Sequence, residues 1–252
     1  MIAVLSPAKT LDYATPLPPI EATHPRFGEE ARTLAAAAGR LGAKRLGDLM
    51  GISPKLATLN VQRFRGFAEA EERPALYAFA GDVYRGLEAK TLEPEGVAFA
   101  QDHLRLLSGL YGLLRPLDAI RPYRLEMGTR WAPRRKALTD WWGDRIAAAL
   151  ADDLAEEGSG VVLNLASQEY WAAIGDRLAE NVRVVAVDFR QARPDGPKFE
   201  SFAAKRARGT MSRWMAEHRI EEIEAMKGFD ADGYRFAELV DGDADHWRFV
   251  RG

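Results

Sequence analysis

Residues 161–189 read VVLNLASQEYWAAIGDRLAENVRVVAVDF. This stretch begins with the apolar run Val161–Leu165 and ends with the valine-rich run Val182–Phe189, and both runs are typical of buried strands. Residues 168–179 lie between them and are predicted to form a helix. A strand, a helix and a second strand in this order predict two parallel strands joined by a right-handed crossover. The sequence therefore predicts a mixed α/β fold.

The rest of the chain alternates between short apolar runs and longer helix-forming segments. Further strands are expected at Ile2–Leu5 and Lys198–Phe202, with a terminal hairpin of Tyr234–Val240 and His246–Val250. Helices are expected over Glu29–Leu41, over Arg45–Arg63 in two short pieces, and over Pro74–Lys90, Ala98–Leu107, Thr139–Glu157 and Ala203–Arg219. No shift in composition marks a boundary, so we expect one domain over residues 1–252, with a small sheet surrounded by helices.

The chain has 252 residues, no cysteine and a formal charge of −2. The lack of cysteine excludes disulfides, thiolate catalysis and cysteine-based metal sites. No segment resembles a signal peptide or approaches the ~18 consecutive apolar residues of a membrane-spanning helix. We therefore expect a cytoplasmic protein.

The near-neutral total hides three basic segments. Positive charges outnumber negative ones by four in Lys44–Arg65, by five in Gln101–Lys136 and by four in Lys198–Arg219. Residues 221–245 carry nine acidic side chains against two basic ones. Each basic segment is either an ordinary solvated face or, if the fold gathers the three on one side, part of a cationic surface that suits phosphates.

The first basic segment contains a pattern for two short helices around a tight turn. Residues 49–57, LMGISPKLA, resemble the turn of a helix–hairpin–helix, whose usual form is LPGIGxxxA. The hairpin would be Gly51, Ile52 and Ser53, within an element of about residues 44–65. Met50 and Ser53 depart from the usual proline and glycine. An ordinary αα-corner is the alternative.

In a helix–hairpin–helix, the second helix offers free backbone N–H groups to a phosphate. Lys55, Arg63 and Arg65 would add charge-assisted contacts there. The pattern therefore favours contacts to a phosphate backbone.

The second basic segment is rich in glycine, arginine and tyrosine. Arg121 and Arg124 are candidates for forked contacts to phosphates, and Tyr111 or Tyr123 for stacking on a base. Alternatively, Glu126 pairs with an arginine and the tyrosines belong to the core.

Helical periodicity divides the third basic segment into two faces. One face, which we expect to be buried, carries Ala204, Ala207, Met211, Trp214, Met215 and His218. The opposite face carries Lys205, Arg206, Arg208 and Arg213. We expect this second face to be exposed, either to a phosphate backbone or to water.

Polar residues also follow two of the expected strands. Lys9 comes after the first strand, and Asn164 and Ser167 lie at the end of another, where sites in α/β proteins tend to form. The segment SPAKT at residues 6–10 lacks the glycines of a P-loop, and no nucleophile elbow or metal-binding histidine pair is present. The residues therefore indicate surfaces that suit phosphates, with no recognisable catalytic machinery, metal site or cofactor.

Several long motifs resemble those of one protein family. They are SPAKTLDY at residues 6–13, GDVYxGL at 81–87, HLRxLSGLYG at 103–112, LRPLD at 114–118, PYRLEMG at 122–128, NLASxEY at 164–170 and AKxARGxMSR at 204–213. By these motifs the chain is identified as a member of the YaaA family, also called UPF0246, which is associated with the bacterial peroxide stress response.

The resemblance implies a cytosolic protein with a fold peculiar to the family, which binds DNA through a positively charged cleft and a helix–hairpin–helix. It also implies protection from hydrogen peroxide, linked to limiting free iron and to DNA repair. We therefore expect contacts to double-stranded or branched DNA, mainly through phosphates and without strong sequence specificity. The candidate contacts are Lys9, Lys55, Arg63, Arg65, Arg121, Arg124, Lys205, Arg206, Arg208 and Arg213.

The alternative is an enzyme that acts on a nucleotide or another phosphorylated small molecule. Its candidate residues lie on expected loops or strand ends, where catalytic groups usually sit, and are Lys9, Arg124, Glu126, Asn164 and Ser167. A third possibility, iron sequestration by the protein itself, is disfavoured by the lack of cysteine and of paired histidines.

Overall fold

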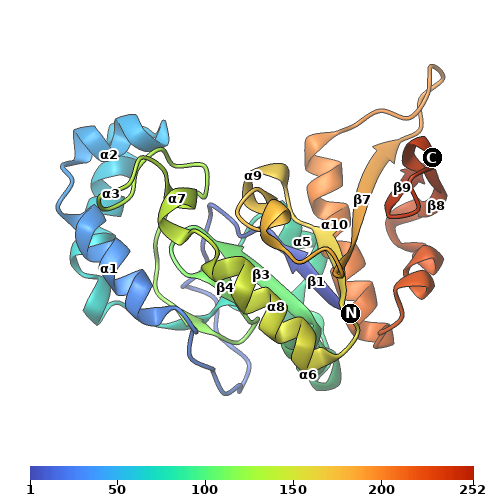
Figure 1. Ribbon diagram of the computed structural model, residues 1–252. Coiled ribbons are helices and arrows are strands. Elements are labelled where there is room, and N and C mark those ends of the chain that lie inside the picture. Colours follow the sequence, from blue (N-terminus) through green and yellow to red (C-terminus); the bar gives the residue numbers. More distant parts are fainter.

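A computed structural model describes residues 1–252, and a seven-stranded sheet lies at its centre (Figure 1). The strands are β1 (Ile2–Leu5), β3 (Leu104–Ser108), β4 (Gly112–Leu114), β6 (Val161–Leu165), β7 (Arg183–Gln191), β8 (Tyr234–Leu239) and β9 (His246–Arg251), in the order β4-β3-β1-β6-β7-β9-β8. The five inner strands are parallel, and only the edge strands β4 and β8 run antiparallel to their neighbours. A separate pair consists of β2 (Arg73–Pro74) and β5 (Ala119–Ile120). The predicted mixed α/β class is confirmed.

Strand β1 lies in the middle of this sheet, and all four of its side chains are fully buried. It pairs in parallel with β3 on one side and with β6 on the other. A parallel strand that is covered on both faces has a continuous apolar sequence and no alternation, as the run Ile-Ala-Val-Leu has. One core of 67 buried hydrophobic residues extends from Met1 to Phe249, so the chain forms a single domain.

Helices cover the sheet, and one group of helices extends away from it (Figure 1). Their bounds are α1 (Gly28–Gly39), α2 (Ala43–Met50), α3 (Pro54–Arg65), α4 (Ala75–Ala78), α5 (Asp82–Leu87), α6 (Pro94–His103), α7 (Leu138–Trp142), α8 (Arg145–Glu157), α9 (Gln168–Trp171) and α10 (Ser201–His218). Helix α6 packs on β1 and β3, α10 on β7, and α8 on β4. Helices α1, α2 and α3 pack on one another at the left of Figure 1, far from the β8–β9 hairpin at the right.

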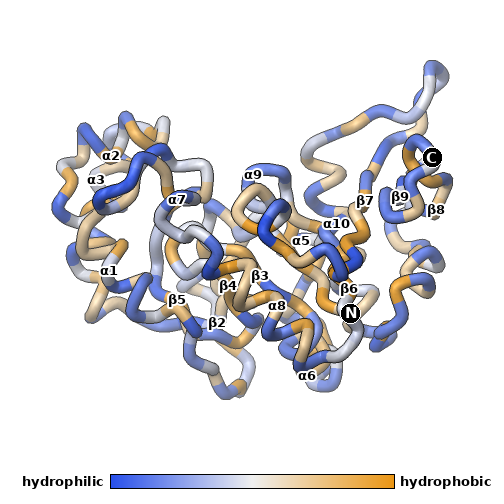
Figure 2. The backbone as a smooth tube through the Cα atoms, in the orientation of Figure 1, coloured by the Kyte–Doolittle hydropathy of each residue, from blue (hydrophilic) through white to orange (hydrophobic).

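Hydropathy follows this arrangement along the chain. Figure 2 shows hydrophobic residues along strands β3 and β4 and hydrophilic ones along the loop that precedes α7. That loop contains Arg134, Arg135 and Lys136, all of them exposed. The parallel pair β6–β7, the first strand, the terminal hairpin and the two short helices α2 and α3 all form where the sequence predicts them.

Two predicted elements are wrong. The helix predicted over Ala98–Leu107 ends at His103, and the residues after it form β3. Because every side chain of β3 is buried, this segment has no alternation that would distinguish a strand from a helix. The strand predicted at Lys198–Phe202 is replaced by a single bridge between Lys198 and Gln191, and Ser201 already begins α10.

Three predicted helices are interrupted. The segment 74–90 contains α4 and α5, which are separated at Gly81. Gly143, with a φ of +52°, separates α7 from α8 within the segment 139–157. In the segment 168–179 only α9 and a 3₁₀ turn at Gly175–Arg177 form.

Helices α5 and α10 approach so closely that their backbones touch. A Cβ atom at Gly209 of α10 would lie 1.7 Å from the carbonyl oxygen of Val83, and one at Gly86 of α5 would lie 2.1 Å from the carbonyl oxygen of Arg206. Since no real Cβ tolerates such distances, these two glycines determine how α10 sits on the rest of the molecule.

We expect Gly209→Ala to lower the free energy of unfolding by at least about 2 kcal/mol, because the added methyl group must push the two backbones apart. This loss would exceed the gain of about 1 kcal/mol that alanine brings to a helix interior. Urea denaturation followed by circular dichroism measures the change. Gly28→Ala is the control because nothing lies within 4 Å of a Cβ atom there, and its stability should stay near that of the wild type.

Candidate functional site

The strand order reverses direction between β1 and β6. From β1 the chain moves to its neighbour β3 on one side, whereas β6 on the other side is followed by β7, one position further out. In open parallel sheets, ligands bind outside the carboxyl ends of the strands at such a switch point. The residues that follow Leu5 and Leu165 therefore lie where the topology predicts a site.

Two serines meet at this point. Ser6 follows β1, Ser167 follows β6, and the backbone N–H of Ser167 donates to Ser6 Oγ at 2.9 Å. Ser6 Oγ in turn donates to Ser167 Oγ at 3.2 Å. These bonds join the ends of two strands that are 161 residues apart in the chain.

A carboxylate between two cations lies beside the serines. Lys9 Nζ is 2.7 Å from Glu126 Oε2, and Arg124 Nη2 is 2.9 Å from Glu126 Oε1. The Lys9 side chain is 59% exposed, while those of Glu126 and Arg124 are 18% and 17% exposed. The predicted alternative, in which Glu126 pairs with an arginine, is confirmed.

A third loop joins the same group. Glu169, in the first turn of α9, accepts the backbone N–H of Gly128 through Oε1 at 3.0 Å. We use the term switch-point cluster for Ser6, Lys9, Arg124, Glu126, Ser167 and Glu169. These residues come from three segments of the chain that are joined by side-chain contacts.

Buried tyrosines lie close to the cluster, and one of them contacts it. The Tyr84 hydroxyl donates to the carbonyl oxygen of Ser6 at 3.3 Å, and the Tyr123 hydroxyl lies 2.6 Å from Ser108 Oγ. Burial raises the pKa of Tyr84, Tyr123 and Tyr170 well above the ordinary value, so all three stay protonated and neutral. The prediction that Tyr123 belongs to the core is therefore confirmed, and it is equally buried with Tyr111.

Asp188 lies near the same edge on the next strand. The last pair between β6 and β7 is Asn164 with Ala186, so Asp188 stands two residues beyond it, where β6 has already ended. Its carboxylate accepts from Arg190 at 2.7 Å and from Arg248 at 3.2 Å. Burial lowers the pKa of the Arg208 guanidinium, and the negative charge of Asp188 offsets this in part.

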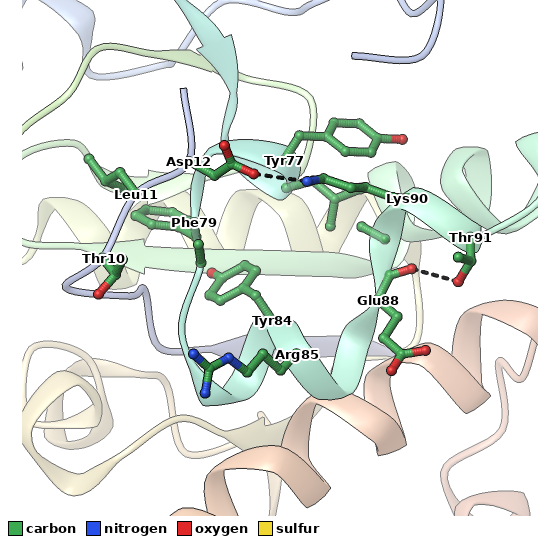
Figure 3. A pocket seen from close by; sticks show the side chains of 13 residues that line it. Thr10, Leu11, Asp12, Tyr77, Phe79, Tyr84, Arg85, Glu88, Lys90 and Thr91 are labelled. Atoms are coloured by element: carbon green, nitrogen blue, oxygen red, sulfur yellow. Dashed lines mark hydrogen bonds and ion pairs between the residues drawn. The ribbon is translucent and has the colours of Figure 1, made fainter. Parts of the chain in front are cut away.

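A cavity of about 550 Å³ adjoins the segment that carries Lys9 (Figure 3). Thr10, Leu11 and Asp12 form one wall, and residues of α4, α5 and the 3₁₀ turn Ala89–Thr91 form the others. Lys90 Nζ lies 2.8 Å from Asp12 Oδ2, and this contact holds the pKa of Asp12 well below its usual range. Tyr84 lines the cavity while its hydroxyl reaches Ser6.

The α2–α3 pair forms a second polar surface, away from the sheet. Helix α2 ends at Gly51, whose φ of +59° is a left-handed conformation that favours glycine. Ser53 Oγ accepts the N–H of Leu56 at 3.4 Å and so caps α3, with Pro54 in the first turn. Lys55 is exposed and Ala57 is buried between the helices.

A model of the family described as "Peroxide stress protein YaaA" matches residues 1–239. The chain belongs to this family. A UPF0246 protein of Rhizorhabdus wittichii is 60% identical over 252 residues, which cover all of this chain and 99% of the relative. UPF0246 proteins of Dinoroseobacter shibae and Hahella chejuensis are 49% and 44% identical, over 94% and 100% of this chain and 90% and 99% of the relatives. The recognised family is thereby confirmed.

The predicted basic residues of this YaaA-family chain divide into separate groups. Lys55, Arg63 and Arg65 lie on α3, where Arg65 donates to the carbonyl oxygen of Gly39 and burial lowers the pKa of Arg63. Arg121 pairs with Glu72 at 3.0 Å and lies over the ring of Phe67. In Figure 1, α3 lies at the left and α10 at the right beside β7, with β3 and β4 between them.

The two faces predicted for α10 are correct only in part. Lys205 and Arg206 are exposed, but Arg208 and Arg213 are largely buried, so the expectation of a fully exposed cationic face is wrong. Arg213 donates to carbonyl oxygens at the end of α5, and Arg208 is buried with Asp188 of β7 as its nearby charge, neither of which helical periodicity alone reveals. His218 is exposed in the last turn and not in the core as predicted, because the buried face ends at Ala216.

Sequence reasoning missed Ser6, Asp188 and Glu169. Ser6 and Glu169 belong to the motifs quoted above, and a polar residue directly after a buried strand is a usable signal for Ser6. Asp188 lies inside a predicted strand, and only the pairing register brings it beyond the end of β6. No helix is long and apolar enough to cross a membrane, and no three acidic or histidine side chains gather where they could hold a metal ion.

We expect Ser6→Ala to lower the free energy of unfolding by about 1–2 kcal/mol, because the N–H of Ser167 loses its acceptor between two strand ends. Chemical denaturation measures the loss. The exposed Ser201 serves as the control, and Ser201→Ala should leave the stability unchanged. Equal stabilities of the two variants would contradict a structural role for the serine pair.

Arg213→Gln should lower the free energy of unfolding by about 1–3 kcal/mol, because its guanidinium donates to the carbonyl oxygens of Leu87, Glu88 and Thr91. Lys205→Gln, an exposed position on the same helix, should have almost no effect. Thermal unfolding of both variants makes the comparison. A loss confined to Lys205→Gln would refute this assignment.

Proposed function

We propose that this protein binds double-stranded or branched DNA in the peroxide stress response and contacts the phosphate backbone through the α2–α3 pair. The observation that carries the proposal is the geometry of this pair: a left-handed Gly51, a Ser53-capped α3 and an exposed Lys55 with no acidic partner. Two short helices around such a turn support the helix–hairpin–helix that the sequence predicts, for which an ordinary αα-corner is the alternative. The family description supplies the link to peroxide stress.

The outer side of α3 offers suitable chemistry for a phosphate backbone. Lys55, Thr58, Leu59 and Gln62 line a shallow groove of about 530 Å³ with Ser53 and Leu56. A lysine with hydroxyl and amide side chains around it can contact phosphate oxygens without reading bases. Sequence preference should therefore be weak, and affinity should depend strongly on salt.

Other basic residues contribute less in this proposal. Lys205 is exposed on α10 and has no acidic partner, so it remains a candidate contact. Lys9, Arg124, Arg121, Arg206 and Arg213 each already hold a carboxylate within 4 Å, and a phosphate would have to compete with it. The implied links to free iron and to DNA repair stay predictions.

Lys55→Gln should weaken binding to a duplex of mixed sequence and reduce the slope of log K against log[salt] by about 0.9, the value for one lost phosphate contact. Fluorescence anisotropy over a series of salt concentrations gives both quantities. Arg235→Gln is the matched control, since it also removes one positive charge but lies on β8 at the opposite end of the molecule. Its slope should equal that of the wild type.

Two results would count against the proposal. If folded wild-type protein fails to bind duplex or branched DNA at low salt, DNA binding is excluded. If both variants weaken binding equally, net charge and not the α2–α3 surface determines the affinity.

A further inference from the structure

We propose that the switch-point cluster binds a small phosphate ester with a hydroxylated body, such as a nucleotide or a sugar phosphate. This site is on the sheet and not on the α2–α3 pair, so the proposal goes beyond DNA binding and does not depend on it. It rests on the topology, on unused hydrogen-bond donors and on the adjoining cavity.

The sheet topology predicts where this site lies. The cluster lies at the carboxyl ends of β1 and β6, where the strand order reverses. Three segments converge there, and their contacts are Lys9 with Glu126 at 2.7 Å and Gly128 with Glu169 at 3.0 Å. A site assembled from loops on a rigid parallel sheet is the arrangement in which small ligands are usually held.

Several donors of the cluster are not used within the protein. Ser167 Oγ accepts from Ser6, and its own hydroxyl hydrogen has no acceptor. Arg124 directs both Nε and Nη2 to a single oxygen of Glu126, which leaves its Nη1 donors free. Lys9 contacts one carboxylate oxygen and is 59% exposed, so further N–H groups of its ammonium face solvent. Donors of these kinds suit the oxygens of a phosphate group.

The hydrogen-bond acceptors of the cluster indicate which chemical groups the ligand carries besides its phosphate. The two cations Lys9 and Arg124 are balanced by the two carboxylates Glu126 and Glu169, so net charge alone would not retain a bare anion. A ligand that carries hydroxyl groups beside its phosphate would satisfy donors and acceptors together. A carboxylate that accepts a ribose hydroxyl is a common feature of nucleotide sites in α/β folds.

The adjoining cavity offers space for the body of such a ligand. Its volume of about 550 Å³ is within the usual range of small-molecule sites, and Leu11, Leu76 and Phe79 give it apolar walls. Figure 3 shows Thr10 and Tyr84 among the lining residues. Thr10 follows Lys9 in the sequence, and the Tyr84 hydroxyl donates to the carbonyl oxygen of Ser6. An aromatic base would gain contact with these walls that a bare sugar would not.

The test is isothermal titration calorimetry with inorganic phosphate, ribose 5-phosphate and adenosine 5′-monophosphate, at an ionic strength kept constant with sodium chloride. We expect saturable binding of both esters, with phosphate alone the weakest. A tighter complex with the monophosphate would indicate a nucleotide, and equal affinity would indicate a sugar phosphate.

Lys9→Gln and Arg124→Gln should each weaken ester binding at least about tenfold, because each removes a charge-assisted contact. Arg235→Gln is the control and should bind as the wild type does. Lys9 is exposed, so its substitution keeps the proposal testable if Arg124→Gln does not fold. Circular dichroism identifies the folded variants.

The proposal is overturned if none of the three probes binds to folded wild-type protein, or if Lys9→Gln binds the esters as tightly as Arg235→Gln. Lys55→Gln separates this proposal from DNA binding: we expect it to weaken DNA binding and to leave the ester titration unchanged. Either proposal can therefore fail while the other stands.

Discussion

The complete burial of β1 is the constraint on which the rest of the structure depends. Four apolar residues with no exposed surface must be covered on both faces and paired on both sides. Their partners, β3 and β6, come from segments about one hundred and one hundred and sixty residues further along the chain. The chain therefore has to return twice to its own first strand, and the helices between β1 and β3 are the connection that the first return requires.

The same constraint determines where polar groups can gather. Since β3 and β6 pair with β1 on opposite sides, the chain diverges at the carboxyl end of β1, and the loops after β1 and β6 meet there. Ser6 and Ser167 join the two loops through a hydrogen bond from the Ser167 N–H to Ser6 Oγ. The neutral hydroxyl of Tyr84 donates to the carbonyl oxygen of Ser6. The cluster around Glu126 thus adjoins the carboxyl end of the fully buried strand β1.

The sequence predicted the elements that follow from local pattern, which are the β6–β7 pair, the terminal hairpin and the capped turn at Ser53. It failed for elements whose structure depends on which strands pair with each other. The run LRLLS forms a strand only because β1 and β4 accept it on both sides, and propensity alone favours a helix there as much as a strand. Lys9, Arg124, Glu126 and Ser167 were all candidates from their positions in loops, but their meeting at one point required the strand order. Asp188 was missed for the same reason.

Arginine content is a weak indicator of nucleic-acid binding in this chain because many of its arginines stabilise the fold. Arg105 lies in the second basic segment, yet it is buried, pairs with Asp153 at 2.6 Å and donates to three carbonyl oxygens around the end of α6. Arg213 likewise donates to the carbonyl oxygens of Leu87 and Glu88 at the end of α5. Such donors satisfy carbonyls that helix ends leave unpaired, and a phosphate could reach them only by breaking these bonds. A basic run in the sequence therefore gives an upper limit to the cations that a ligand can use. Lys55 is an exception in this molecule. It is exposed on α3, away from the sheet, and its ammonium group pairs with no carboxylate and caps no helix end.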